Sequence, residues 1–210
     1  MTEPSKSFDR AADEYEHGRP GYPDTIADVV PVAPSATVLD LAAGTGKLTR
    51  VLARRYARVI AVEPLAALRA IVEREAPVAV ALDGRAEAIP LGDAAVDAVF
   101  VAQAFHWFAN DDAVAEIARV LRPGGVLAIL SNETVPPVPL PDAYRKRLEE
   151  LGGKRPPAAS DWRETIARGP FEPLRRASVE HEQVSDKAAV LAFAASLSFI
   201  ASRDDREAAL

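Results

Sequence analysis

An acidic residue, a glycine-bearing loop and a second acidic residue downstream form the group best suited to chemistry in this sequence. Asp40 is followed by Leu-Ala-Ala-Gly-Thr-Gly, which ends in Gly44 and Gly46. Glycines permit positive φ and let the backbone approach a ligand closely. Glu63 follows Asp40 by 23 residues, and a carboxylate there can accept hydrogen bonds from both hydroxyls of a ribose. The spacing predicts a site for a nucleoside-containing cofactor.

Other uses of such a loop differ in their spacing. A phosphate-binding P-loop needs two glycines five residues apart, then Lys and a hydroxyl residue. Leu41 stands five residues before Gly46, and a leucine stands where the hydroxyl residue would be, which excludes a P-loop. The dinucleotide pattern Gly-x-Gly-x-x-Gly places Thr49 at its third glycine, so a nicotinamide-dependent oxidoreductase stays open as a weaker alternative. A tight turn without a ligand is the remaining interpretation.

Alternating short apolar runs and helical stretches must position these residues. The pattern predicts strands at 37–41, 58–62, 78–82, 95–102 and 126–130, with helices through 56, at 65–74 and at 112–121. Such alternation is typical of an α/β domain with a doubly wound, mostly parallel sheet. Ligands bind at the carboxyl ends of the strands in these sheets. We therefore expect the glycine loop and Glu63 to share one edge.

The flanking segments carry weaker patterns. Apolar residues at helical spacing predict a helix at about 6–17, and Asp24 is placed to cap a short helix that reaches about residue 30. Beyond residue 131 the sequence predicts a proline-rich connector at 135–141, helices at about 142–151 and 160–168, a strand at 176–184 and a helical stretch at 186–210.

Composition narrows the classes of function. The chain has 210 residues, a formal net charge of −6 and no cysteine, so disulfides and cysteine-built zinc sites are excluded, and no metal site is expected. Broad nucleic-acid binding is disfavoured because it relies on many Lys and Arg side chains. The sequence has no stretch of apolar residues long enough to span a membrane and no secretory signal pattern. We expect a cytoplasmic protein that binds neither nucleic acid nor membrane.

Four motifs in order resemble class I S-adenosylmethionine (SAM)-dependent methyltransferases of type 11, including those similar to trans-aconitate methyltransferase. They are the glycine loop at 38–47, Asp-Gly-Arg-Ala-Glu-Ala-Ile-Pro-Leu at 83–91, Gln-Ala-Phe-His-Trp-Phe at 103–108, and the segment at 116–125 that contains Arg-Pro-Gly-Gly. The resemblance implies a Rossmann-like methyltransferase fold and SAM as cofactor. The last motif is expected to turn a helix into the fifth strand.

The resemblance also implies roles for individual residues. Asp40 would lie near the ammonium group of SAM, and the loop backbone would pack against its methionine part. This chain has alanine at position 42, where glycine is commonest in the family, and Arg85 where many members have an aspartate that accepts from adenine. The adenine contact is thus expected through the backbone near residues 85 and 86. The cofactor-binding set is Asp40, Ala42, Gly44, Gly46, Glu63, Pro64, Arg85, Ala86, Glu87, Gln103, Tyr15 and Arg19.

The last two residues of that set belong to an N-terminal segment similar to the family's lid. The predicted organisation is a helical lid at 1–34, a SAM-binding core at 35–131, and a substrate region at 132–210 with helices and one strand of the same domain. The family fold usually ends in an antiparallel hairpin, whereas this sequence ends in a helical pattern, so a shortened C-terminal end is expected. Loss of a strand would expose a sheet edge or favour dimerisation, so a monomer and a homodimer both stay open.

The function implied is in-line transfer of a methyl group to a small organic acceptor. His106 is the candidate general base, needed only if the acceptor must lose a proton, and His17 is a second candidate. A structural or substrate-contacting role for His106 is the alternative. A non-catalytic SAM-binding protein also stays open.

Overall fold

The computed structural model describes residues 16–133, 146, 150 and 162–195. They belong to two compact units, of which the first comprises residues 1–20, 132–158 and 183–210 and the second residues 21–131 and 159–182. The first unit contains helix α8, Lys187–Ala195. The second contains the sheet and the helices packed on it. Among the described residues, no helix has the length and apolarity needed to cross a membrane.

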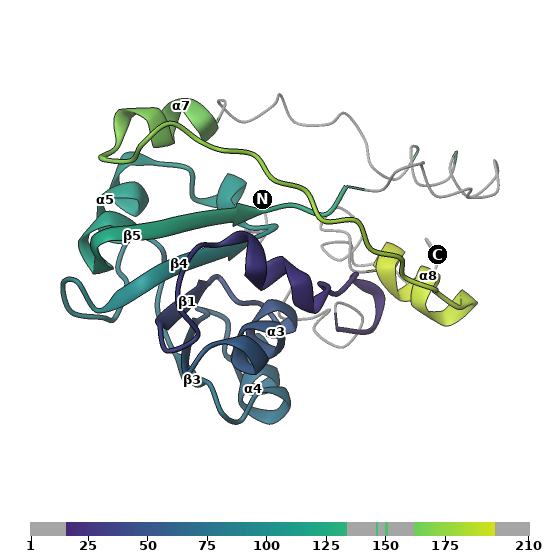
Figure 1. Cartoon of the computed structure of the whole chain (residues 1–210). Coiled ribbons are helices and arrows are strands. Elements are labelled where there is room, and N and C mark those ends of the chain that lie inside the picture. The colour runs from purple at the N-terminus through teal and green to yellow at the C-terminus, as the bar shows by residue number, and fades with distance from the viewer. Residues whose placement is uncertain (1–15, 134–145, 147–149, 151–161, 196–210) are drawn as a thin grey trace. The chain divides into compact units, whose positions relative to one another are not determined.

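Five parallel strands form the sheet of the second unit (Figure 1). They are β1 (Thr37–Leu41), β2 (Arg58–Val62), β3 (Val80–Leu82), β4 (Val96–Ala102) and β5 (Leu121–Leu130), in the order β3-β2-β1-β4-β5. Every neighbouring pair is parallel. The chain winds outward from β1 to β3 and then crosses back to β4 on the other side of β1. The carboxyl ends of β1 and β4 therefore flank the point where the strand order reverses, which is where ligands bind in open α/β sheets.

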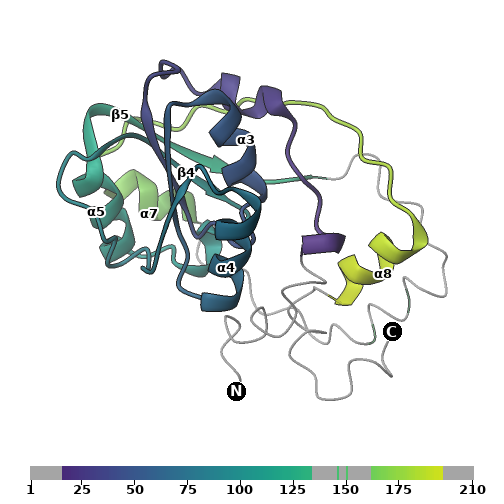
Figure 2. The same ribbon diagram turned by 90° about the horizontal axis from the view of Figure 1, so that it is seen from below.

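Helices cover both faces of the sheet, as Figure 2 shows. On one face lie the 3-10 helix η1 (Asp24–Val29), α3 (Lys47–Arg55) and α4 (Ala66–Glu75). On the other lie α5 (Asp111–Val120) and α7 (Trp162–Arg168). Successive residues of a strand point to opposite faces. Accordingly, Val38 packs in the apolar cluster under α3, and Leu39 in the cluster under α5. The predicted doubly wound α/β fold is confirmed.

The predicted boundaries agree closely with the observed ones for most strands of the sheet and for the helices packed on it. There are two local differences. β3 begins at Val80 rather than at residue 78, because its pairing with β2 starts at Val80, opposite Ile60. The Arg-Pro-Gly-Gly segment lies inside β5 instead of preceding it. Val96 pairs with Leu121 and Ala98 with Val126, so the intervening residues form an irregularity in the strand, at which Gly124 adopts a φ of 78°.

The predicted strand at 176–184 is wrong, because the described chain has neither strand nor helix there. The alternating pattern of that segment does not make a strand, since a strand also needs a neighbour to pair with. The predicted capping role of Asp24 is also wrong. Pro23 is the N-cap residue of η1 and no side chain caps the helix, while Asp24 forms an ion pair with Arg54 of α3.

The other flanking predictions are covered only in part. α7 and α8 lie within the predicted helical stretches at 160–168 and 186–210. The predicted helix at 142–151 and most of the one at 6–17 lie outside the described residues, as does the proline-rich connector.

Candidate functional site

The loop after β1 adopts backbone angles that favour glycine at three positions. Ala42, Gly44 and Gly46 have φ values of 58°, 60° and 79°. Residues other than glycine rarely adopt this left-handed conformation because their Cβ atom approaches the backbone. The angle at Ala42 gives a physical reason for the family's preference for glycine at this position. Gly46 then serves as the N-cap of α3.

Asp40 lies at the carboxyl end of β1 with its side chain almost wholly buried. The Thr49 hydroxyl donates a hydrogen bond to Asp40 Oδ2 at 2.6 Å. Burial raises the pKa of Asp40 to about 7, the Thr49 hydrogen bond opposes this rise, and the nearby charge of Glu63 adds to it. Among the described residues, the hydrogen bonds to this carboxyl come from Thr49 and not from a cation. The carboxyl is therefore poised to ionise when a positively charged group approaches.

Glu63 joins the end of β2 to the glycine loop. Its Oε2 accepts a hydrogen bond from the Gly44 backbone N–H at 2.9 Å, and its Oε1 accepts one from Leu65 N–H at 3.0 Å. Burial raises the pKa of Glu63, and the two backbone N–H donors oppose that rise. Each carboxylate oxygen can accept more than one hydrogen bond, so lone pairs are left for hydroxyl donors. Pro64, next in the chain, is exposed.

Two residues that sequence reasoning missed support these carboxyl groups. Thr49 lies on the buried face of α3, and a hydroxyl on an otherwise apolar helix face was the available signal. Arg69 of α4 donates from Nη1 to the Glu63 backbone oxygen at 2.7 Å and lies 3.5 Å from Asp83. No sequence motif marks Arg69, because its role arises only from the packing of α4 beside β2.

The segment after β3 forms a tight turn. Ala88 N–H donates to the Arg85 backbone oxygen at 3.0 Å, and Ala86 is buried in the apolar core. The Arg85 side chain is 77% exposed and lies 3.9 Å from Glu87. The backbone of this turn is held in place while the Arg85 side chain is largely in solvent. This geometry is compatible with the predicted contact through the backbone.

The segment after β4 carries the aromatic motif. Gln103 has a φ of 57°, and a single turn of 3-10 helix, η2 (Phe105–Trp107), follows it. Phe105 is buried and packs edge-on against Trp162 with ring centres 5.6 Å apart. His106 lies against Trp107, with centres 4.8 Å apart. Burial lowers the pKa of His106, which favours the neutral imidazole at neutral pH. Trp107 is 49% exposed.

The predicted lid residues belong to the first unit. The Arg19 guanidinium lies over the Phe193 ring of α8, 5.3 Å from its centre. Tyr15 lies outside the described residues, and His17 lies in the described helical residues 16–18. The lid role of this segment stays a prediction.

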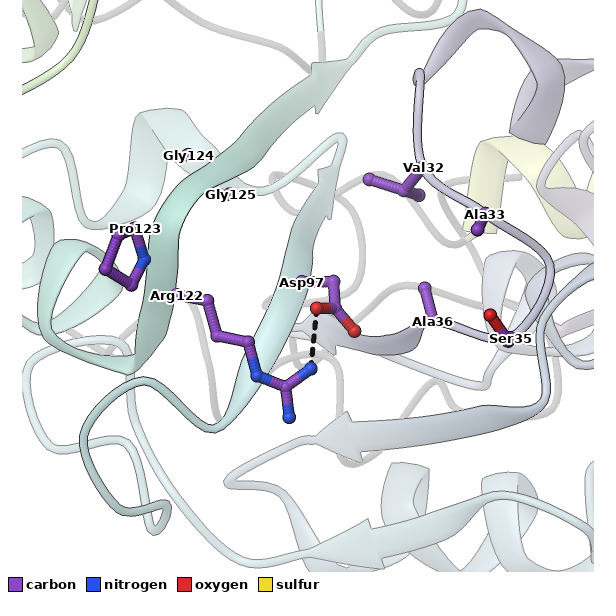
Figure 3. Close-up of a pocket in the computed structure, with 9 residues that line it drawn as sticks. All are labelled: Val32, Ala33, Ser35, Ala36, Asp97, Arg122, Pro123, Gly124 and Gly125. Carbon is purple, nitrogen blue, oxygen red and sulfur yellow. Dashed lines mark hydrogen bonds and ion pairs between the residues drawn. The ribbon is translucent and has the colours of Figure 1, made fainter.

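A cavity of about 410 Å³ lies at the opposite, amino edge of the sheet (Figure 3). Arg122 Nη1 donates to Asp97 Oδ1 at 2.5 Å, and Thr37 N–H donates to Asp97 Oδ2 at 2.8 Å. The residues that line this cavity are Val32, Ala33, Ser35, Ala36, Asp97, Arg122, Pro123, Gly124 and Gly125. None of these belongs to the predicted cofactor-binding set.

Comparison with known proteins decides the family. An uncharacterised methyltransferase of Mycobacterium tuberculosis is 49% identical over 128 residues, which are 61% of this chain and 53% of that protein. A methyltransferase-like protein of Schizosaccharomyces pombe is 36% identical over 81% of this chain and 69% of its own length. The family profile described as Methyltransferase domain, type 11, matches residues 39–129. The chain belongs to this methyltransferase family.

The match spans about half the length of the mycobacterial relative. A demethylmenaquinone methyltransferase of Thermus thermophilus is 38% identical over 49% of this chain and 48% of that protein. A solved structure from Anaeromyxobacter dehalogenans, assigned to the type II methyltransferases, is 28% identical, with a TM-score of 0.59 over 87% of this chain and 80% of that one. This family of methyltransferases is SAM-dependent.

The residues of the carboxyl edge fit SAM chemically. The cofactor carries an ammonium group, a ribose diol and an adenine. Asp40 is a buried carboxyl that accepts a hydrogen bond from the neutral Thr49 hydroxyl, and Glu63 is a carboxylate held against the loop by two backbone donors. In addition, the buried Thr45 hydroxyl at the tip of the loop has no hydrogen-bond partner within the described part of the chain. Among the described residues, no group of three His, Asp or Glu could hold a metal ion.

Proposed function

We propose that this chain transfers a methyl group from SAM to a small organic acceptor. The observation that carries the proposal is the hydrogen bond from Gly44 N–H to Glu63 Oε2 at 2.9 Å. It joins the loop expected to hold the methionine part to the carboxylate expected to hold the ribose. A tight turn without a ligand has no need for a buried carboxylate between two strand ends, because burying a charge is costly.

The chain's own residues would bind and orient the cofactor. Asp40 receives the ammonium group, the backbone of residues 42–46 packs along the methionine part, and Glu63 with Pro64 holds the ribose. The turn from Arg85 to Glu87 meets the adenine, and Gln103 closes the site from the end of β4. When bound, SAM supplies a methyl group on a sulfonium, which an acceptor takes by in-line displacement. The protein's contribution is alignment of the acceptor and exclusion of water.

His106 is the proposed general base where the acceptor must lose a proton. Its pKa is lowered by burial, so the imidazole is free to accept a proton at neutral pH. Its position after β4 supports this role, since β4 neighbours β1 in the sheet. If His106 acts in this way, His106→Gln lowers kcat and removes an acid limb from the pH profile, whereas a purely packing role changes stability alone.

The acceptor is proposed to be a small organic molecule rather than a nucleic acid. The formal net charge of −6 opposes association with phosphate backbones, and the Thermus relative is a demethylmenaquinone methyltransferase by name. The motif at 103–108 supports a place beside the trans-aconitate methyltransferase-like members. A lid at 1–34, a substrate region at 132–210, a cytoplasmic location and a monomeric or homodimeric state stay predictions from the sequence.

Calorimetry with S-adenosylhomocysteine tests the cofactor. Micromolar or tighter binding by the wild-type chain is expected, at least about 8 kcal/mol of binding free energy. Absence of binding at millimolar ligand would overturn the proposal. Formation of S-adenosylhomocysteine from SAM with a panel of carboxylates, phenols, amines and quinones then tests turnover. Binding without turnover across the panel would favour the non-catalytic SAM-binding protein.

Arg19→Ala tests the lid. Weaker cofactor binding or slower turnover is expected if Arg19 closes over the site. Unchanged values for both would exclude that role.

A further inference from the structure

Glu116 and Arg119 of α5 form a closely bonded pair on the helix surface. Arg119 Nε donates to Glu116 Oε1 and Arg119 Nη2 to Glu116 Oε2, both at 2.7 Å. This two-point contact between a guanidinium and a carboxylate fixes both side chains in one orientation. The hydrogen bonds from Arg119 hold the pKa of Glu116 below its usual range, so the pair is charged at neutral pH.

The same pair binds the backbone of the loop that leads into β4. Ile89 N–H donates to Glu116 Oε2 at 2.9 Å, and Arg119 Nη2 donates to the Ile89 oxygen at 3.1 Å. Arg119 Nη1 donates to the Leu91 oxygen and to Asp93 Oδ1, at 2.8 and 2.9 Å. The pair therefore satisfies both backbone groups of one residue and a third group two residues later.

These contacts immediately follow the turn at 85–88. The carbonyl and N–H that close that turn belong to Arg85 and Ala88, so Ile89 is the first residue after it. A second contact from α5 reaches the turn itself: Asn110, the N-cap residue, donates to Glu87 Oε1 at 3.0 Å. One helix thus holds the segment at two places. An unsupported loop of this length would sample many backbone conformations.

We propose that Glu116 and Arg119 are positioning residues for adenine recognition. They fix the backbone at 89–91 so that the turn at 85–88 presents its N–H and C=O groups to the adenine edge in one geometry. This inference rests on the proposed function, because it takes the bound nucleoside to be that of SAM. It assigns the Glu-x-x-Arg pair a part in cofactor selection besides its place in the helix that leads into β5.

The test compares two ligands on a conservative variant. S-adenosylhomocysteine and its analogue with hypoxanthine in place of adenine differ at the ring edge, and the wild-type chain is expected to prefer adenine by about tenfold. In Arg119→Lys an ammonium replaces the planar fork and cannot bond the carboxylate and two carbonyls together. The affinity for S-adenosylhomocysteine should fall about tenfold, and the preference for adenine should fall below about threefold.

Arg122→Lys is the matched control. Arg122 also bonds one carboxylate and one backbone oxygen, those of Asp97 and Ala95, but at the amino edge of the sheet. The Arg122→Lys variant should keep both the affinity for S-adenosylhomocysteine and the preference for adenine. Hydrogen exchange of peptides spanning 83–93 gives a second measurement, since Ile89 N–H should exchange faster in Arg119→Lys than in the wild type.

The outcomes separate the two proposals. A folded Arg119→Lys chain that retains the adenine preference overturns the positioning role, as does an equal loss in Arg122→Lys. A wild-type chain that binds neither ligand overturns the proposed function instead. If Arg119→Lys does not fold, Glu116→Gln carries the comparison: it can still accept from Ile89 N–H but loses the charged contact with Arg119. Retained preference in that variant also overturns the role.

Discussion

Each edge of the sheet carries an aspartate, Asp40 near the end of β1 and Asp97 near the start of β4. The two carboxyl groups differ in their hydrogen-bond partners. At the carboxyl edge, Asp40 is buried and accepts a hydrogen bond from the neutral Thr49 hydroxyl, and burial raises its pKa to about 7. At the amino edge, Asp97 accepts from Arg122 and from the Thr37 N–H, and these bonds lower its pKa. A cationic ligand would stabilise the ionised form of Asp40, whereas Asp97 already has Arg122 as a cationic partner.

The cavity lined by Arg122 and Asp97 and the carboxyl groups with raised pKa values therefore lie at different edges of the sheet. The cavity of about 410 Å³ lies at the amino edge, where Arg122 and Asp97 bond each other and the ends of strands (Figure 3). The carboxyl edge carries left-handed loop residues, two carboxyl groups with raised pKa values and a buried Thr45 hydroxyl that has no hydrogen-bond partner among the described residues. Perturbed titratable groups tend to cluster at functional sites, and ligands in open α/β sheets bind at the carboxyl ends of the strands.

The largest expected difference is in the pH dependence of stability caused by Asp40. Its folded pKa is about 7 against 3.8 for the free side chain, so between these values the folded chain holds a proton that the unfolded chain releases. Stability should fall as pH rises through this window, by up to about 4 kcal/mol. Urea unfolding at pH 4.5 to 8 should show Asp40→Asn gaining on the wild type as pH rises. A constant difference across this range would contradict the raised pKa.

The next largest expected difference is in the cofactor affinity of variants at Glu63 and at Asp97. Both carboxylates accept a backbone N–H from another strand end or loop, so their amide variants lose similar structural contacts. Glu63→Gln should weaken S-adenosylhomocysteine binding about 10- to 100-fold, because it leaves one oxygen where the diol and backbone need two. Asp97→Asn is the control and should bind within about twofold of the wild type. Calorimetry on both variants decides, and equal losses would remove the distinction between the edges.

Two glycines sharpen the comparison through backbone conformation. Gly46 and Gly124 have φ values of 79° and 78°, so alanine is strained at either position by about 1 kcal/mol. A Cβ at Gly46 would also lie 3.2 Å from Val72 Cγ2, whereas nothing lies within 4 Å at Gly124. Thermal unfolding should show Gly46→Ala as the more destabilised, by about 1–2 kcal/mol in total.

Only Gly46→Ala is expected to weaken cofactor binding as well, since only its loop belongs to the carboxyl edge. Equal melting temperatures for the two variants, or weaker binding by Gly124→Ala, would run against this assignment.

The smallest effect is the opposite pH slope at Asp97. Its folded pKa is lowered by the hydrogen bond from Arg122 and then by that from Thr37 N–H, so its contribution is present above the unfolded pKa and is lost as pH falls. Because the pair is partly exposed, the contribution should be under about 1 kcal/mol. Asp97→Asn should lose stability at pH 7, and its difference from the wild type should shrink as pH falls below 3.8. A difference that stays constant as pH falls below that value would mean that packing, not charge, is responsible.

Much of the core could be predicted because its signals are local. β1 and β2 follow continuous apolar runs and were predicted to the residue. The predicted strand at 176–184 is wrong, because the alternation of apolar and polar residues carries no information about a neighbouring strand to pair with. The predicted capping role of Asp24 is wrong because its side chain binds Arg54 instead, which lies 30 residues away in the sequence.

The sequence by itself determined the strand pattern and the spacing of Asp40, the glycine loop and Glu63, because apolar periodicity and loop composition act over short stretches of chain. Only the tertiary structure decided that Glu63 bonds Gly44, that Thr49 faces Asp40, and that Glu116 with Arg119 holds the loop before β4. These contacts join residues that only packing brings together. The pKa values follow from the same cause, since burial and neighbouring charges arise when the layers close.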